Sequence, residues 1–79
     1  MWNQVTDEMR NASAILVMRM MLVNYSKTQG ISLPEALLRF ARSNTYEVLF
    51  DFSTGVWREG PRYLQATWDE EIANNHHKA

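Results

Sequence analysis

The chain has 79 residues, no cysteine, and a formal net charge of −1 from eight Lys and Arg against nine Asp and Glu. A chain of this length forms one domain, and it buries only about 60–65% of its unfolded surface. The lack of cysteine excludes disulfides and thiolate metal sites, and the balanced charge excludes a general attraction to nucleic-acid phosphates or anionic lipid. The start of the chain is unlike a secretory signal, so we expect a cytoplasmic protein without a membrane segment.

The first predicted element is a long helix from Thr6 or Asp7 to Lys27 or Thr28. Thr6 can cap its N-terminus, because a threonine hydroxyl accepts a hydrogen bond from a free amide of the first turn. Acidic residues suit the positive end of a helix dipole and Lys27 suits the negative end. Gly30 supplies the stop signal.

Residues 14–23 of this helix are apolar at nine of ten positions, and Arg19 is the exception. At 100° per residue these side chains point all round the helix, and such a helix must be covered on every side. The run is therefore either the central helix of a small bundle or a surface that docks on another protein chain. A buried Arg19 would need a carboxylate such as Glu47 or Asp51. The alternative is that its stem lies along apolar surface while the guanidinium reaches water.

The second predicted helix begins at the segment Ser32-Leu33-Pro34-Glu35. This segment has the form of a capping box, with proline in the first turn, where its missing N–H is harmless. Apolar residues then follow at helical spacing as far as about Arg42: Leu33, Ala36, Leu37, Phe40 and Ala41.

Two interpretations are open for residues 45–58. Asn44 offers a helix cap, and it is followed by Tyr46, Leu49 and Phe50 on one helical face. Alternate residues from 46 to 52 are also apolar and favour strands, with a turn at residues 53–55. The helical context favours a short third helix, and the alternative is a β-hairpin at 45–58.

A last helix is predicted from Pro61 to about Ala73, with Leu64, Trp68 and Ile72 on one face and a frayed polar tail at 74–79. The chain as a whole is predicted to be an all-α bundle of four helices, the third of them short. Its excess apolar surface is expected to be covered in a homodimer or by a partner protein.

Five residues are candidates for contact with a partner. Met18, Met20 and Met21 could form an adaptable binding surface, because thioether side chains repack around varied partners, although helix-spaced methionines also serve as ordinary core. Trp57 and Arg58 are of the types that dominate binding energy at interfaces, although a connector tryptophan also caps small cores.

The remaining motifs give no chemistry. Asp69, Glu70 and Glu71 are adjacent on a helix, so their carboxylates diverge and form a solvated face. We expect no catalytic residue, metal, cofactor or small-molecule substrate, since no nucleophile, base and orienting group can be grouped from this sequence.

A family resemblance extends over roughly residues 14–72. It is carried by Ser43-x-x-Tyr46-x-x-Leu49, by Trp57-x-x-Gly60-x-x-Tyr63-Leu64, and by the acidic residues 69–71. These motifs resemble a family of small uncharacterised bacterial proteins classed as a domain of unknown function. Trp57 stands where relatives commonly have histidine, so a role for that histidine does not carry over. The family is often encoded beside toxin-type proteins related to ADP-ribosyltransferases, which implies an accessory or antitoxin-like role.

The function expected from the sequence is a non-catalytic interaction module that binds a second copy of itself, a protein encoded nearby, or both. The alternative is a small helix-turn-helix regulator, in which Arg39 and Arg42 contact phosphates and residues 43–45 open a recognition helix. Glu47 and Asp51 in that recognition segment count against DNA binding, since they repel phosphate.

Overall fold

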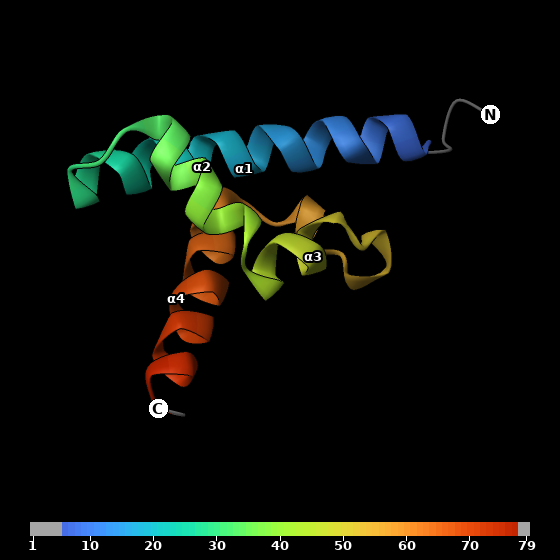
Figure 1. Ribbon diagram of the computed structural model, residues 1–79. Coiled ribbons are helices and arrows are strands. Elements are labelled where there is room, and N and C mark those ends of the chain that lie inside the picture. Colours follow the sequence, from blue (N-terminus) through green and yellow to red (C-terminus); the bar gives the residue numbers. More distant parts are fainter. Residues whose placement is uncertain (1–5, 78–79) are drawn as a thin grey trace.

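The computed structural model describes residues 6–77, and in this range the chain is all-α. Its elements in chain order are α1 (Asp7–Gln29), α2 (Leu33–Ala41), α3 (Asn44–Phe50), the single-turn 3-10 helices η1 (Phe52–Thr54) and η2 (Val56–Arg58), and α4 (Pro61–His77). In Figure 1, α1 crosses the whole molecule, α2 folds back over the C-terminal half of α1, and α4 leads away at a steep angle. The predicted bundle of four helices is confirmed, and residues 45–58 form α3 and the 3-10 turns in place of the alternative hairpin.

The ends of α1 follow the predicted signals. The Thr6 hydroxyl accepts a hydrogen bond from the Met9 amide at 3.1 Å, which makes Thr6 the N-cap. Gly30 ends the helix with φ 67°, a left-handed conformation in which glycine carries no steric penalty, and its amide donates to the Ser26 carbonyl. The end of α1 lies within two residues of the prediction.

The start of α2 uses half of the predicted capping box. The Ser32 hydroxyl accepts a hydrogen bond from the Glu35 amide at 3.2 Å. The Glu35 carboxylate turns along the helix to Arg39, which donates to it at 3.3 Å, in place of a bond back to Ser32. The helix ends at Ala41, one residue before the predicted end.

The cap of α3 is Ser43, one residue earlier than the predicted Asn44. Ser43 has extended backbone angles, and its hydroxyl accepts from the Tyr46 amide at 3.1 Å while donating to the Phe40 carbonyl at 2.6 Å. Those two bonds satisfy a buried hydroxyl, which explains why the serine and not the asparagine begins the helix. Asp51 ends α3, and its carboxylate accepts hydrogen bonds from the Ser53 amide and hydroxyl to begin η1.

The last helix is longer than predicted. It begins at Pro61 as expected, but it continues to His77, four residues beyond Ala73. Asn74 and Asn75 are weak helix formers, and the helix continues through them as an exposed extension of a packed helix. Residues 78 and 79 of the predicted frayed tail lie outside the described range.

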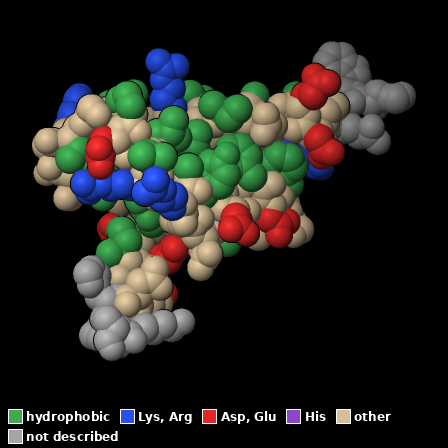
Figure 2. Space-filling view, in the orientation of Figure 1, with side chains coloured by type: hydrophobic (Ala, Val, Ile, Leu, Met, Phe, Trp, Pro, Cys, Tyr) green, Lys and Arg blue, Asp and Glu red, His purple; other side chains and the backbone are tan. Residues whose placement is uncertain are grey.

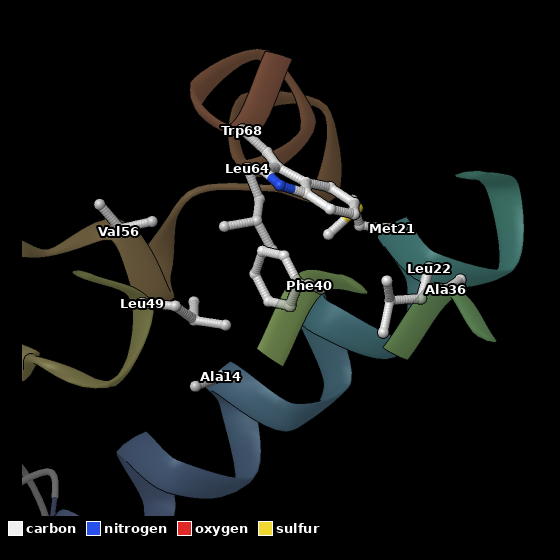
Figure 3. Close-up of a cluster of buried hydrophobic side chains, with 9 residues drawn as sticks. All are labelled: Ala14, Met21, Leu22, Ala36, Phe40, Leu49, Val56, Leu64 and Trp68. Atoms are coloured by element: carbon white, nitrogen blue, oxygen red, sulfur yellow. The ribbon is translucent and has the colours of Figure 1, made fainter. Parts of the chain in front are cut away.

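One small core holds the helices together. Phe40 lies at its centre with no exposed surface, and its ring meets Trp68 at 4.9 Å and Tyr46 at 5.8 Å between ring centroids. Figure 3 shows Leu49, Leu64 and Trp68 around this ring. The buried side chains come from α1, α2, α3, η2 and α4. The buried apolar set is Ala14, Met21, Leu22, Ala36, Phe40, Leu49, Val56, Leu64 and Trp68.

Candidate functional site

The helix α1 is apolar on two sides, and its own chain covers only one of them. The inner side carries Ala14, Met21 and Leu22, which are buried in the core. On the opposite side Leu16 is 58% exposed and Met20 is 50% exposed. The all-round apolar helix predicted from the sequence is therefore half core and half surface.

The exposed apolar surface continues onto α2. Leu33, Leu37 and Leu38 are 40%, 42% and 50% exposed, while Ala36 and Phe40 of the same helix are completely buried. Leu33 and Leu37 follow the same helical spacing as Ala36 and Phe40 but stay exposed, because α2 turns only its 36–40 edge inward. We call the exposed apolar side chains of the two helices the outer face: Met9, Ile15, Leu16, Met20, Leu33, Leu37 and Leu38.

The two helices that carry the outer face lie against each other. Figure 3 shows Leu22 of α1 beside Ala36 of α2. Ile15 lies two turns before Leu22 along the edge of α1 that faces α2, and at 45% exposure it forms the border between the core side and the exposed side of α1. Figure 2 shows apolar side chains gathered over α1 and α2, with both basic and acidic side chains around them. The outer face is thus one surface built by two neighbouring helices.

Charged side chains are sparse on the uncovered side of α1. Arg19 is exposed, so its guanidinium is in water and it forms no buried ion pair with Glu47 or Asp51. The Asp51 carboxylate binds Ser53, and hydrogen bonds from the Ser53 hydroxyl and amide hold the pKa of Asp51 below its usual value. Of the two predicted environments for Arg19, the structure shows the exposed one.

The three candidate methionines have different surroundings. Met20 belongs to the outer face, Met21 is 1% exposed and lies in the core, and Met18 is partly buried against that core. Met20 and Met21 also line a groove of about 470 Å³ between α1 and α4, together with Asn24, Pro61, Arg62, Gln65, Ala66 and Asp69. Met20 is therefore the one of the three that a partner can reach over a large area.

Trp57 and Arg58 form part of the turn between α3 and α4. The Trp57 indole donates to the Phe52 carbonyl at 3.1 Å, and its ring meets the Phe52 ring edge-on at 6.3 Å. The Arg58 guanidinium lies 5.5 Å from the centre of the Trp57 ring. Trp57 is half-buried by these contacts, so much of its surface already packs within its own chain.

The acidic segment of α4 contains a structural residue that the sequence analysis missed. Glu71 was predicted to be part of a solvated face, but its carboxylate accepts hydrogen bonds from the Asn44 amide at 2.9 Å, the Thr45 amide at 2.8 Å and the Thr45 hydroxyl at 2.6 Å. Partial burial raises the pKa of Glu71, but the three hydrogen bonds outweigh it and leave this pKa below its ordinary value. The prediction failed because the partner lies 26 residues away in the chain.

This contact also bears on the DNA-binding alternative. In a helix-turn-helix, the N-terminus of the second helix commonly meets a phosphate. Here the free amides at the start of α3 are already bound to Glu71, so a phosphate would have to displace a carboxylate of the same chain. Two arginines were proposed to contact phosphate. Arg39 forms an ion pair with Glu35, whereas Arg42 is exposed.

No metal site emerges from the described side chains, where no group of three His, Asp or Glu is close enough together to hold an ion. Within residues 6–77, none of the helices combines the length and the hydropathy that a bilayer crossing requires. Comparisons with family models, curated proteins and solved structures returned no match.

Proposed function

We propose that this chain is a non-catalytic interaction module that binds another protein chain through the outer face. The observation that carries the proposal is the exposure of seven large apolar side chains, between 40% and 58% each, on two helices that lie against each other. Together they leave roughly 600 Å² of apolar surface in water, which is at the upper end for the largest patch on a soluble monomer. A patch of that size is typical of a protein-binding surface.

The make-up of the outer face supports this proposal. Interfaces combine an apolar centre with a polar rim, and Arg and Met are more common there than elsewhere on the surface. Met9 and Met20 are flexible enough to repack against a partner, and Arg19 lies among the apolar side chains of α1. The groove beside Met20 adds a hollow in which a partner side chain can insert.

The class of partner is a second part of the proposal. The family resemblance supports an accessory or antitoxin-like role in the cytoplasm, with a toxin-type protein encoded nearby as the partner. The excess apolar surface itself supports self-association as well, and the two are compatible if a dimer presents the remaining surface to a further protein.

The test is a double variant, Leu16→Ser with Leu38→Ser, which removes one exposed side chain from each helix of the outer face. The wild-type protein and the variant are compared by light scattering coupled to gel filtration, and by affinity capture from the source cells followed by binding measurements with the purified candidate. We expect the variant to keep its helical circular dichroism and to bind at least tenfold more weakly to itself or to the partner.

The matched control is Tyr63→Ser. Tyr63 is 52% exposed, similar to the two leucines, but it lies on α4 outside the outer face. Binding that survives Tyr63→Ser and is lost in the double variant supports the proposal. Binding that is insensitive to both changes, or a wild-type protein that binds neither itself nor the candidate, would overturn it.

A further inference from the structure

We propose that the partner on the outer face is a second copy of this chain, with the two α1 helices packed side by side in opposite directions. This inference rests on the proposed function and names its partner. A two-fold dimer requires a surface that is complementary to itself, and the uncovered side of α1 meets that requirement in its packing and in its charges.

The N-terminal part of α1 is the first reason. No side chain in residues 6–13 is buried, although these residues form almost two turns of regular helix. A helical segment gains most of its stability in water from packing, and in these turns only Arg10 and Ser13 are partly covered. In Figure 1 they extend away from α2, which covers the other end of α1. Antiparallel pairing places these N-terminal turns of one α1 against the C-terminal half of α1 in the other copy, next to the α2 leucines.

The charges of α1 are the second reason. The exposed charged residues on its uncovered side are Glu8 near the start, Arg19 near the middle and Lys27 near the end. In an antiparallel pair the acidic end of each helix meets the basic end of the other, and the helix dipoles also oppose each other favourably. In a parallel pair each of these charged residues would lie opposite the same residue of the other copy, so like charges would meet.

The register is the one that brings the acidic end of each helix level with the basic end of the other. Glu8 and Lys27 lie on opposite flanks of the seam, so they set the height of the pairing without forming an ion pair. In this register Ala12 is level with Val23, and Leu16 is level with Arg19. The positions 12, 16, 19 and 23 alternate steps of four and three residues, which is the spacing of a helix-packing seam. The Arg19 stem then packs on Leu16 while its guanidinium reaches water at the side of the seam.

The available area is sufficient for a dimer. A stable interface buries about 800 Å² per partner, and slightly more than half of that is apolar. The outer face offers roughly 600 Å² of apolar surface per copy, before its polar border is counted.

The absence of native cysteine permits a direct test by disulfide cross-linking. In the double variant Ala12→Cys with Val23→Cys, the thiol at position 12 of one copy lies opposite the thiol at position 23 of the other copy. Mild oxidation should therefore give a covalent dimer in high yield. Positions 12 and 23 differ by eleven residues, or about 16 Å along a helix. A disulfide needs Cα atoms closer than about 7 Å, so no bridge can form within one helix.

The single variants are the matched controls. In the antiparallel register the two copies of position 12 lie about 16 Å apart along the seam, so Ala12→Cys alone should not cross-link, and Val23→Cys alone should not either. Cross-linking of the double variant has to disappear in urea, which shows that it depends on the folded dimer. The double variant is checked by circular dichroism before oxidation.

Other results would overturn this inference in distinguishable ways. Cross-linking of Ala12→Cys alone indicates a parallel pair. A dimer that forms without any of these cross-links indicates a different interface. A protein that stays monomeric at 100 µM but binds a foreign chain through the outer face overturns the dimer and leaves the proposed function intact.

Arg19→Leu provides a second readout that does not depend on thiols. Replacing a charged residue at a seam position with leucine should tighten self-association about threefold to tenfold by sedimentation equilibrium, since charged seam residues lower coiled-coil stability. The same substitution would weaken binding to an acidic foreign partner. Self-association weakened by Arg19→Leu would overturn the proposed register.

Discussion

On α1 and α2 the core and the outer face are built from similar residues, yet one is buried and the other is in water. Met21 and Leu22 are 1% and 2% exposed, whereas Leu16 and Met20 of the same helix are 58% and 50% exposed. The difference comes from where the other helices attach, since α2, α3 and α4 all pack around one side of α1. Apolar character alone therefore does not separate residues that stabilise this fold from residues free to bind a partner.

The largest expected effect is on the core side of that comparison. Phe40→Ala removes the fully buried ring at the centre of the molecule and should cost about 3–5 kcal/mol of unfolding free energy. The free energy of unfolding of a domain is only about 5–15 kcal/mol in total. A small domain near the lower limit would therefore lose most of its stability. Urea titration followed by circular dichroism measures the loss. A cost below about 1 kcal/mol would contradict the assignment of Phe40 to the core.

A smaller effect is expected where α4 supports α3. Glu71→Ala removes the carboxylate that accepts three hydrogen bonds at the start of α3, and should cost about 1–2 kcal/mol. The pKa of Glu71 is lower when folded than its ordinary 4.5, so its contribution is complete at neutral pH and is lost as the pH falls through 4.5 towards the folded value. Urea titrations of wild type and variant at several pH values should therefore converge in acid.

Glu70 provides the control for this prediction. It lies next to Glu71 on α4 but is exposed to solvent. Glu70→Ala should change the unfolding free energy by less than about 0.5 kcal/mol at any of these pH values. Equal losses from the two substitutions would show that Glu71 acts only as a surface charge.

The turn between α3 and α4 should respond to a change at a single glycine. Gly55 has φ 75°, and a Cβ added there would lie 3.0 Å from the Arg58 guanidinium that stacks on Trp57. Gly55→Ala should cost about 1 kcal/mol from the left-handed backbone, with a small change in Trp57 fluorescence. Gly60→Ala is the control, because a Cβ at Gly60 has no neighbour within 4 Å. Equal effects of both substitutions on unfolding would contradict this interpretation.

The smallest effect on stability is expected on the outer face. Leu16→Ser, measured at a protein concentration too low for self-association, should change the unfolding free energy by less than about 0.5 kcal/mol, because the side chain makes few contacts within its own chain. Thermal unfolding at low and high protein concentration separates the stability of the single chain from the stability gained by self-association. A large loss of unfolding free energy at low protein concentration would show that Leu16 stabilises the fold as a core residue does, and it would contradict the distinction between the core and the outer face.

The sequence predicted the helices well because their ends are determined locally. Thr6, Gly30, Ser32 and Pro61 act on amides and carbonyls within a few residues, so their roles follow from short motifs. The third helix was harder to predict because its apolar residues fit two periods, and the choice was decided by the polar caps at Ser43 and Asp51.

The surface was harder to predict for a different reason. The spacing of Leu33 and Leu37 is the same whether a helix is covered on one side or on two, and only the positions of α3 and α4 decide which leucines stay exposed. Glu71 and α3 are similarly separated in sequence, so no short motif connects them. What could be read from the sequence was the excess of apolar residues on α1, and that excess is the part of the candidate site that was found.

The position of Leu64 and Trp68 in the core also affects how the chain folds during synthesis. Phe40 and Met21 gain their cover only when α4 packs over them, so the core cannot close until residue 68 has left the ribosome. At about 5–20 residues per second, the apolar helix α1 waits for seconds outside the exit tunnel without its partners. Nascent chains are therefore expected to bind chaperones that recognise exposed apolar segments, and a ribosome-bound chain arrested before Trp68 emerges should be far more sensitive to protease than the released protein.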